Sequence, residues 1–352
     1  MLDLYTDYLI SQNKYATATG LSDMVSGDVS HDKVTRFLNG DLKDSKALWT
    51  YIKPTIRQKE QQGGVLILDD TIEEKPYTDE NDIVCWHHCH SKNRHVKGMN
   101  ILSCLVRYDN IVLPVGYEIV TKEVRFCEIK TKAEKRRASV GKNEHFQSLI
   151  GQAFNNKVLF DHVLADNWFA AKGNLDYIHY ELEKKFIIGI KSNRTVTLNG
   201  QDKKNKNFTK VKDLDLEDGK AIKVWLKANA FPVMLIKKNF TNEDGANGIL
   251  YLISNDLDLN EDDLYKTYQK RWDIETYHKS IKQNASLAKS PTKRVRSQAN
   301  HIFASIVAFC KLETLRFKTA LNHFAIKYKL LINANQAALK KLHEMQNFTP
   351  TA

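Results

Sequence analysis

Two apolar runs that each lead into an aspartate restrict the possible folds most. VLILDD (65–70) follows a Gly-Gly pair, and KVLFDHVLADN (157–167) carries a similar run before its last aspartate. Apolar runs of four to eight residues that are bounded by turn residues predict buried strands. Because helix-like segments separate these runs, we predict an α/β fold in which Asp70 and Asp166 each end a strand.

Other segments extend the α/β pattern. Residues 98–108 and 111–120 predict a hairpin, and residues 142–155 predict a polar helix. Between Lys191 and Asn255, short strand-like segments alternate with Gly, Asn and Asp turns, which predicts a β-rich insertion inside the α/β domain. Later helices are predicted over 261–285 and 296–319, with a frayed helix and tail at 335–352. The predicted domains are an N-terminal helical region (1–60), a first core part (61–190), the insertion (191–257), a second core part (258–320) and a C-terminal helical tail (321–352).

The N-terminal helices contain a pair that fits a helix-turn-helix. Ser30 can cap a helix that runs through Arg36 and stops at Gly40. The exposed side of this helix would carry Lys33 and Arg36, which makes them candidate DNA contacts. A plain helical packing module fits the same pattern equally well.

The net charge of the chain indicates which class of molecule it binds. The formal net charge is +11 with a pI near 9.2, and the basic residues are spread along the chain. This balance favours a polyanion, with nucleic acid ahead of an anionic membrane. No apolar run approaches the roughly 20 residues that span a bilayer, and the N-terminal segment does not resemble a secretory signal, so we expect no membrane association. Five irregularly spaced cysteines favour a reducing compartment, the cytoplasm.

One helical row carries a single acid among basic and phenolic groups. In YQKRWDIETYHKSIK (268–282), helical periodicity places Tyr268, Arg271, Glu275 and Lys282 on one face. Asp70 and Asp166 are predicted to end neighbouring strands, and Glu275 on the helix could lie close to both. Three such carboxylates would repel a polyanion unless they bind divalent cations, and Mg²⁺ prefers these ligands. Two such ions could support in-line phosphoryl displacement.

The spacing Tyr-x2-Arg-x3-Glu-x6-Lys resembles the YREK signature of bacterial insertion-sequence DDE transposases. LDDT (68–71) and LADNWF (164–169) resemble the two aspartate strands of that family. The resemblance covers roughly residues 20–320. It implies an RNase H-like catalytic core with a β-rich insertion between the second aspartate and the glutamate, an N-terminal helical DNA-binding region and C-terminal helices. It also implies a bacterial, nucleoid-associated protein.

The resemblance assigns roles to individual residues. Asp70, Asp166 and Glu275 would be catalytic and bind the metal ions, Mg²⁺ with Mn²⁺ as a substitute. Arg271 and Lys282 would contact phosphates, Tyr268 would pack against the DNA backbone, and Lys279 is a lesser phosphate candidate. Adjacent strand residues face opposite sides, so only one of Asp69 and Asp70 can face the metal ions. The family pattern places the ligand just before the threonine, which selects Asp70.

CWHHCHSKNRH (85–95) resembles a zinc site, because six Cys and His residues lie close together. Structural zinc sites usually take ligands from two separated pairs, and this stretch has no clear second pair. Related transposases carry a similar stretch that is not a metal site. We therefore expect no zinc, and a polar loop and strand near the active site instead.

Two basic runs and two tryptophans each have two possible interpretations. The runs 130–137 and 203–207 are either solvated surface or sites of non-specific phosphate contact. Trp168 either packs in the core or stacks on a base that is flipped from the duplex, and Trp225 is the rival for that second role.

The sequence thus predicts a metal-dependent transposase that cuts double-stranded DNA at transposon ends and joins the 3′ ends to target DNA. The resemblance implies a hairpin intermediate at the transposon end, and we expect a homodimer in the DNA complex. One alternative is an RNase H-like nuclease that never joins strands. The other is a DNA-binding regulator with an inactive core.

Overall fold

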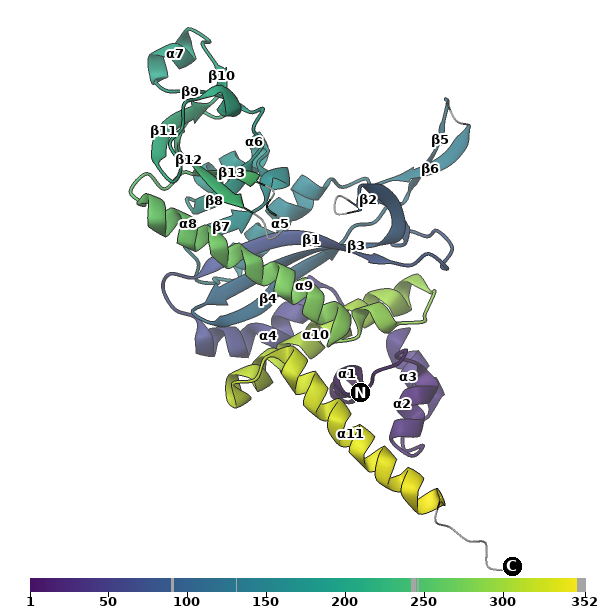
Figure 1. The fold of residues 1–352 in the computed structure, drawn as a ribbon. Coiled ribbons are helices and arrows are strands. Elements are labelled where there is room, and N and C mark those ends of the chain that lie inside the picture. The colour runs from purple at the N-terminus through teal and green to yellow at the C-terminus, as the bar shows by residue number, and fades with distance from the viewer. Residues whose placement is uncertain (90–91, 131, 242–244, 246, 347–352) are drawn as a thin grey trace, which may run out of the picture. The chain divides into compact units, whose positions relative to one another are not determined.

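The apolar run at 65–70 lies in β1 (Val65–Glu74), whose first four residues are fully buried. The predicted strand end at Asp70 is wrong, because β1 continues through Asp70 to Glu74. The computed structural model describes residues 1–352 except 90–91, 131, 242–244, 246 and 347–352 (Figure 1). The chain divides into two compact units. Unit 1 comprises Met1–Tyr51, Glu73–Gly98 and Thr276–Ala352, and unit 2 comprises Ile52–Ile72 and Met99–Glu275. These divisions differ from the predicted domain boundaries, which stay predictions.

Unit 2 is built on a mixed β-sheet. Its strands follow the order β10-β9-β11-β12-β13-β8-β7-β1-β3, and β4 pairs with β3. β7 lies parallel to β1, with Ile67 opposite Leu164, and parallel to β8 on its other side. β7 ends at Ala165, level with the middle of β1, so the residue after β7, Asp166, comes beside Asp69 of β1. The further bounds are β3 (Arg94–Tyr108), β4 (Ile111–Ile119), β7 (His162–Ala165), β8 (Lys185–Ile190), β9 (Thr195–Thr197), β10 (Thr209–Lys210), β11 (Ala221–Leu226), β12 (Pro232–Thr241) and β13 (Asn247–Ser254).

The predicted β-rich segment continues this sheet. β13 pairs antiparallel with β8, and β12 and β11 follow in antiparallel order. The predicted hairpin at 98–108 and 111–120 is confirmed, since Tyr108 pairs with Ile111 in β3 and β4. A second hairpin, β5 (Val124–Glu128) with β6 (Ala133–Arg137), forms a separate two-stranded sheet. The sequence prediction assigned no strands to this hairpin.

Helices of unit 2 follow the strands. The predicted helix at 142–155 is α5 (Lys142–Asn155). The single helix predicted over 261–285 is wrong in one respect, because a 3-10 segment, η4 (Lys270–Trp272), separates α8 (Glu261–Gln269) from α9 (Asp273–Gln283). At the start of α9, Asp273 Oδ2 lies 2.5 Å from Arg107 Nη1 of β3. Shorter elements are η1 (Asn167–Phe169), α6 (Lys172–Asp176), the π-helical η2 (Tyr177–Glu181), α7 (Gly200–Lys204) and η3 (Val211–Asp213).

Unit 1 is mainly helical. Its core joins apolar residues of the first helices, including Tyr5, Leu9 and Leu21, to Ala304 and Leu312 of the long, mostly buried α10. β2 (Cys85–Cys89) pairs antiparallel with the start of β3. The helices are α1 (Leu2–Ser11), α2 (Ala18–Met24), α3 (His31–Leu38), the first part of α4 (Ser45–Lys59), the last part of α9, η5 (Leu287–Lys289), α10 (Val295–Thr319) and α11 (His323–Gln346).

The predicted pair of N-terminal helices is confirmed as α2 and α3. The Ser30 hydroxyl caps α3 by accepting a hydrogen bond from the backbone N–H of Lys33. Lys33 and Arg36 are exposed. The predicted tail is helical to Gln346, and its last residues, 347–352, lie outside the described residues. In the described part of the chain, every helix is too short or too polar to cross a bilayer.

Candidate active site

Two aspartates lie close together where β7 ends beside the middle of β1. Asp69 lies in β1, and its Oδ1 accepts a hydrogen bond of 2.8 Å from the backbone N–H of Asp70. Asp166 directly follows β7 and caps η1, because its Oδ1 accepts a bond of 2.9 Å from the backbone N–H of Trp168. The parallel pairing of β1 with β7 explains why residues 97 positions apart in the sequence come together.

The pKa values of these acids reflect their burial and their closeness to one another. Burial, followed by the charges of Asp166 and Asp70, raises the pKa of Asp69 to about 7. Burial also raises the pKa of Asp166, and the charge of Asp70 adds to that rise. Carboxylates that disfavour one another's ionisation in a dry site are typical of functional centres, although structural ion-pair networks cause similar shifts.

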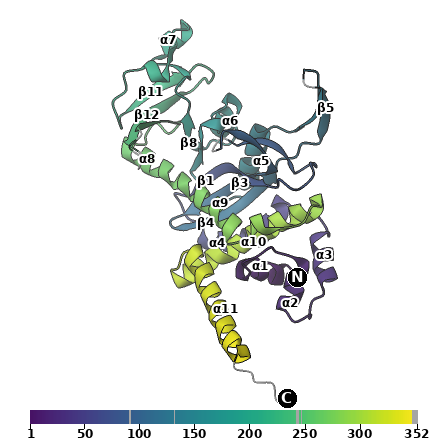
Figure 2. The same ribbon diagram turned by 45° about the vertical axis from the view of Figure 1, so that its right-hand side comes forward.

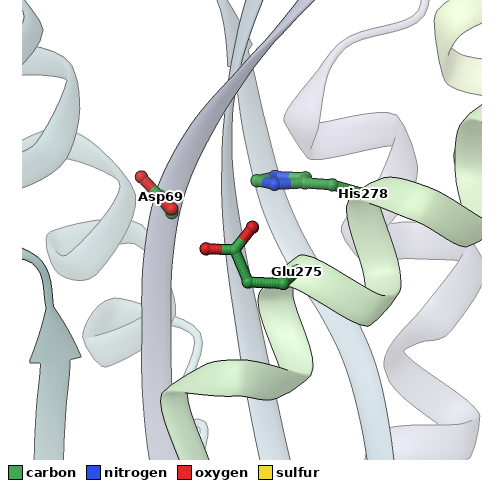
Figure 3. A group of neighbouring side chains, drawn as sticks. All are labelled: Asp69, Glu275 and His278. Atoms are coloured by element: carbon green, nitrogen blue, oxygen red, sulfur yellow. The ribbon is translucent and has the colours of Figure 1, made fainter. Parts of the chain in front are cut away.

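Glu275 completes an acidic group from the helical side. The Asp69 and Glu275 side chains offer carboxylate oxygens that lie within 4.8 Å of each other. Figure 3 shows the two carboxylates pointing toward one another, Asp69 from β1 and Glu275 from α9. The same figure draws His278, which lies one turn further along α9 and belongs to unit 1.

Arg271 lies between these two acids. One guanidinium nitrogen, Nη1, is 3.6 Å from Asp69 Oδ2 and 3.4 Å from Glu275 Oε1. The guanidinium also lies 5.8 Å from the ring centre of Tyr268 and 5.7 Å from that of Trp272. Burial would lower the pKa of Arg271, but the charges around it, with those of Tyr268 and Asp69 the largest, outweigh burial and raise the pKa. Its buried Nε has no hydrogen-bond partner among the described residues.

Tyr268 is packed beneath this arginine. Its ring is 7% exposed, and burial raises the pKa of its hydroxyl. Gly189 of β8 makes room for it, because a Cβ there would lie 3.4 Å from the Tyr268 hydroxyl and 3.2 Å from the backbone nitrogen of Asn167. Tyr268 therefore supports the acidic group from within the fold.

Asp70 has different neighbours from Asp69. Its Oδ2 accepts hydrogen bonds of 2.7 Å from Lys142 Nζ and 2.7 Å from Asn100 Nδ2. The sequence prediction selected Asp70 as the β1 ligand, whereas the structure turns Asp69 toward Glu275 and Arg271. Adjacent strand residues point to opposite faces, and a motif spacing alone does not reveal which face the helix covers.

Lys142 and Asn100 were missed by the sequence prediction. Lys142 begins α5 and contacts Asp70, and its Nζ also lies 4.9 Å from the ring centre of Trp168. Lysines are abundant in this chain, and neither residue stands in a recognisable motif, so no sequence signal distinguished them. Trp168 is 38% exposed, and Trp225 lies in β11 with Lys223 Nζ 5.5 Å from its ring centre.

The remaining row residues, Lys279 and Lys282, belong to unit 1. Lys279 is exposed, and its Nζ lies 5.2 Å from the ring centre of Phe324. Lys282 is half-buried with its Nζ 4.0 Å from Glu73 Oε2. Burial lowers the pKa of Lys282, and the charge of Glu73 opposes that shift. Their predicted phosphate contacts stay predictions.

The residues at 85–95 lie on the β2–β3 hairpin. Cys85 and His87 are buried on one face of β2, whereas Trp86 and His88 are exposed on the other. Across the hairpin, the rings of His88 and His95 lie 5.3 Å apart in an edge-to-face contact. His90 lies outside the described residues, and the absence of zinc stays a prediction.

The acidic group has the donor set of a divalent metal site. Asp69 and Glu275 supply carboxylate oxygens within 4.8 Å of each other, the hard ligands that Mg²⁺ and Mn²⁺ accept, and Asp166 follows the neighbouring strand β7. Burial is the largest cause of the raised pKa of Asp69, and the negative charges of Asp166 and Asp70 add to it, so that a cation would favour the ionised carboxylate. Arg271 already places one positive charge between Asp69 and Glu275. These residues therefore fit a divalent cation.

Comparison with known proteins decides the family. A family model described as "DDE superfamily endonuclease" matches residues 1–209, more than half of the chain. A second, described as "Transposase DDE domain", matches residues 131–310. The chain belongs to the DDE superfamily. The predicted DDE transposase family is thus confirmed, while the YREK signature and the bacterial insertion-sequence origin stay predictions.

No curated protein matches this DDE chain. Solved structures similar to it include one described as "Drosophila P element transposase strand transfer complex", at 11% sequence identity and a TM-score of 0.27. That match covers 56% of this chain and 45% of the Drosophila chain, so this DDE protein spans less than half the length of that relative. The family assignment therefore rests on the sequence matches.

Proposed function

We propose that this protein is a DDE transposase whose acidic centre is Asp69, Asp166 and Glu275, on an RNase H-like core. The observation that carries the proposal is that Asp69 and Glu275 face each other beside Arg271, with Asp166 directly after the neighbouring strand β7. The strand order β4-β3-β1-β7-β8 supports an RNase H-like core, and the strands from β9 to β13 form the insertion before Glu275. Asp69 replaces Asp70 as the proposed β1 ligand because Asp69 faces Glu275.

Asp69, Asp166 and Glu275 would hold two divalent ions, Mg²⁺ or Mn²⁺. Bound there, such ions supply activation of the attacking oxygen and stabilisation of the leaving oxygen in phosphoryl transfer. The chain's own residues prepare this site. Asp70, held by Lys142 and Asn100, fixes the middle of β1 so that Asp69 keeps its direction. Tyr268 and Trp272 flank Arg271 and limit the access of water to its guanidinium.

Positive groups near these acids suit a DNA backbone. Arg271 would exchange part of its contact with the carboxylates for a phosphate, with a geometry that lysine cannot reproduce. Lys279 and Lys282 are proposed as further phosphate contacts and Trp168 as an aromatic contact near the cut. Lys33 and Arg36 on α3 are proposed as contacts to double-stranded DNA. We propose a homodimer on the transposon ends, a hairpin intermediate and action in the bacterial cytoplasm at the nucleoid.

A strand-transfer assay tests the proposal. The substrate is a duplex taken from inverted repeats beside the gene, offered with supercoiled plasmid and Mg²⁺ or Mn²⁺. Cleavage at the repeat end followed by covalent joining to the plasmid is expected, and both should stop in EDTA. Cleavage without joined product would identify a nuclease. Metal-independent binding without cleavage would identify a regulator, and either result would overturn the proposal.

A further inference from the structure

The β5–β6 hairpin is a small sheet of its own within unit 2. Among the described residues, β5 and β6 pair only with each other, from Val124 opposite Arg137 to Glu128 opposite Ala133. Figures 1 and 2 both show this arm standing away from the main sheet of unit 2. A two-stranded hairpin is marginally stable without a covering layer or a partner. The arm therefore gives little to the core and is placed to meet another molecule.

The arm is also strongly basic for its size. Residues 122–137 hold seven basic and three acidic side chains, a net charge of +4, against +11 for all 352 residues. The two strand acids are already engaged, since Glu128 Oε2 lies 2.6 Å from Lys135 Nζ and Glu134 Oε1 lies 3.5 Å from Arg125 Nη1. The excess positive charge thus belongs to the exposed surface of the arm.

The register places like charges together. Arg125 lies directly opposite Arg136 across the ribbon, an arrangement that disfavours the free hairpin. On the opposite face, the Arg137 guanidinium lies 5.9 Å from the ring centre of Phe126, which is 40% exposed. Both faces of the ribbon therefore carry arginine, so an anionic partner could contact either side.

Duplex DNA fits this shape and charge better than other anions. The major groove is about 12 Å wide and admits a two-stranded β-ribbon. A ribbon with arginines on both faces could contact the phosphates of both groove walls, whereas a flat anionic surface would meet one face. Ile129, beyond the end of β5, is 91% exposed and is the apolar side chain that would lead into the groove.

We propose that the β5–β6 arm is a DNA-binding ribbon that enters the major groove of the duplex substrate. This inference rests on the proposed function, because it assigns the arm to the same DNA. It adds a contact that lies outside the acidic centre and outside the Tyr268–Lys282 row. The basic run at 130–137 then has a role beyond that of solvated surface.

Cys127 makes the arm directly testable. It is exposed and free, whereas Cys85, Cys104 and Cys310 are buried. The full-length protein is labelled with azidophenacyl bromide and irradiated with duplex DNA. A covalent adduct is expected, and it should fall to background in Cys127→Ser, which also accounts for labelling at the half-buried Cys89. Equal adduct from both proteins would overturn the proposal.

Salt dependence provides a second readout. The variant Arg125→Ala/Lys130→Ala/Lys132→Ala should lower the log–log salt slope of duplex binding by about 0.9 for each phosphate that the arm no longer neutralises. The matched control, Lys329→Ala/Lys340→Ala/Lys341→Ala, removes the same charge from exposed positions of α11 and should leave the slope unchanged.

The outcomes separate the arm from the proposed function. If the wild type neither binds nor cleaves duplex DNA, the proposed function fails. If it cleaves DNA but the arm variant keeps the wild-type slope and Cys127 gives no specific adduct, the arm inference alone is overturned. Light scattering compares the molecular mass of the arm variant with that of the wild type. If the mass differs while the salt slope of DNA binding is unchanged, the arm contacts protein, and the inference that it binds DNA is overturned.

Discussion

Each unit contains ionisable side chains whose pKa values are shifted by burial. In unit 2, Asp69 and Asp166 lie close together, and Arg271 supplies the compensating charge between Asp69 and Glu275. In unit 1, His301 is fully buried, with Nδ1 2.9 Å from the Tyr5 hydroxyl and Nε2 3.0 Å from the backbone oxygen of Ser286. The two sites differ in charge, since the acids fit a divalent cation and burial favours the neutral form of the histidine.

Burial lowers the pKa of His301 to about 4, and the nearby Lys75 charge acts in the same direction. The unfolded chain binds this proton near pH 6.5, so it binds more protons than the folded chain between pH 6.5 and 4. The contribution of His301 to the free energy of unfolding should thus be fully present above pH 6.5 and should be lost as the pH falls from 6.5 toward 4. Urea unfolding should show a loss on the order of 3 kcal/mol from this group, which His301→Gln should lack. Equal pH slopes in the two proteins would contradict this role.

At the scale of elements, close backbone approach and local helix geometry position the site. In unit 1, Gly98 of β3 lies against the end of β1, where a Cβ would be 2.3 Å from the backbone oxygen of Glu73. In unit 2, η4 tightens the chain between α8 and α9, and Arg107 anchors Asp273 at the start of α9. This anchor sets the direction from which Glu275 approaches the sheet.

Replacement of Gly98 tests the close approach. Gly98→Ala should destabilise the protein by about 1–3 kcal/mol, the range for overpacking in a well-packed interior, because backbone atoms of Glu73 and Glu74 would have to move. Gly200→Ala is the matched control, since a Cβ there meets nothing within 4 Å. Thermal unfolding of the two variants should differ, and equal melting temperatures would show that the β1–β3 contact is loose.

Much of the element pattern could be predicted from the sequence. The apolar runs that became β1 and β8, the hairpin of β3 and β4, and α5 follow from periodicity and turn residues alone. The break at Lys270–Trp272 could not, because the Arg107–Asp273 contact joins residues far apart in the chain. The choice between Asp69 and Asp70 as metal ligand also depends on tertiary packing, which decides which of the two side chains faces Glu275, and a motif spacing does not contain that information.

At the scale of the whole molecule, the basic side chains of the β5–β6 arm and the acids of the proposed centre lie on different elements. The net charge of +11 includes a concentrated share in the β5–β6 arm, while the acids of the proposed centre lie on β1, directly after β7 and on α9. A DNA-processing enzyme needs both, because cations bind the backbone without sequence reading and carboxylates hold the metal ions. Changes to the arm should therefore alter binding, and changes to the acids should alter chemistry.

The most direct test of the acidic centre is the initial rate of Mg²⁺-dependent cleavage in four variants. Asp69→Asn, Asp166→Asn and Glu275→Gln should each reduce the rate by more than the roughly 10- to 100-fold that is typical when a residue only supports a metal ligand. DNA binding should persist in all three. Asp70→Asn should stay within that 10- to 100-fold range, because Asp70 contacts Lys142 and Asn100. An active Asp69→Asn beside an inactive Asp70→Asn would contradict the account and return the ligand role to Asp70.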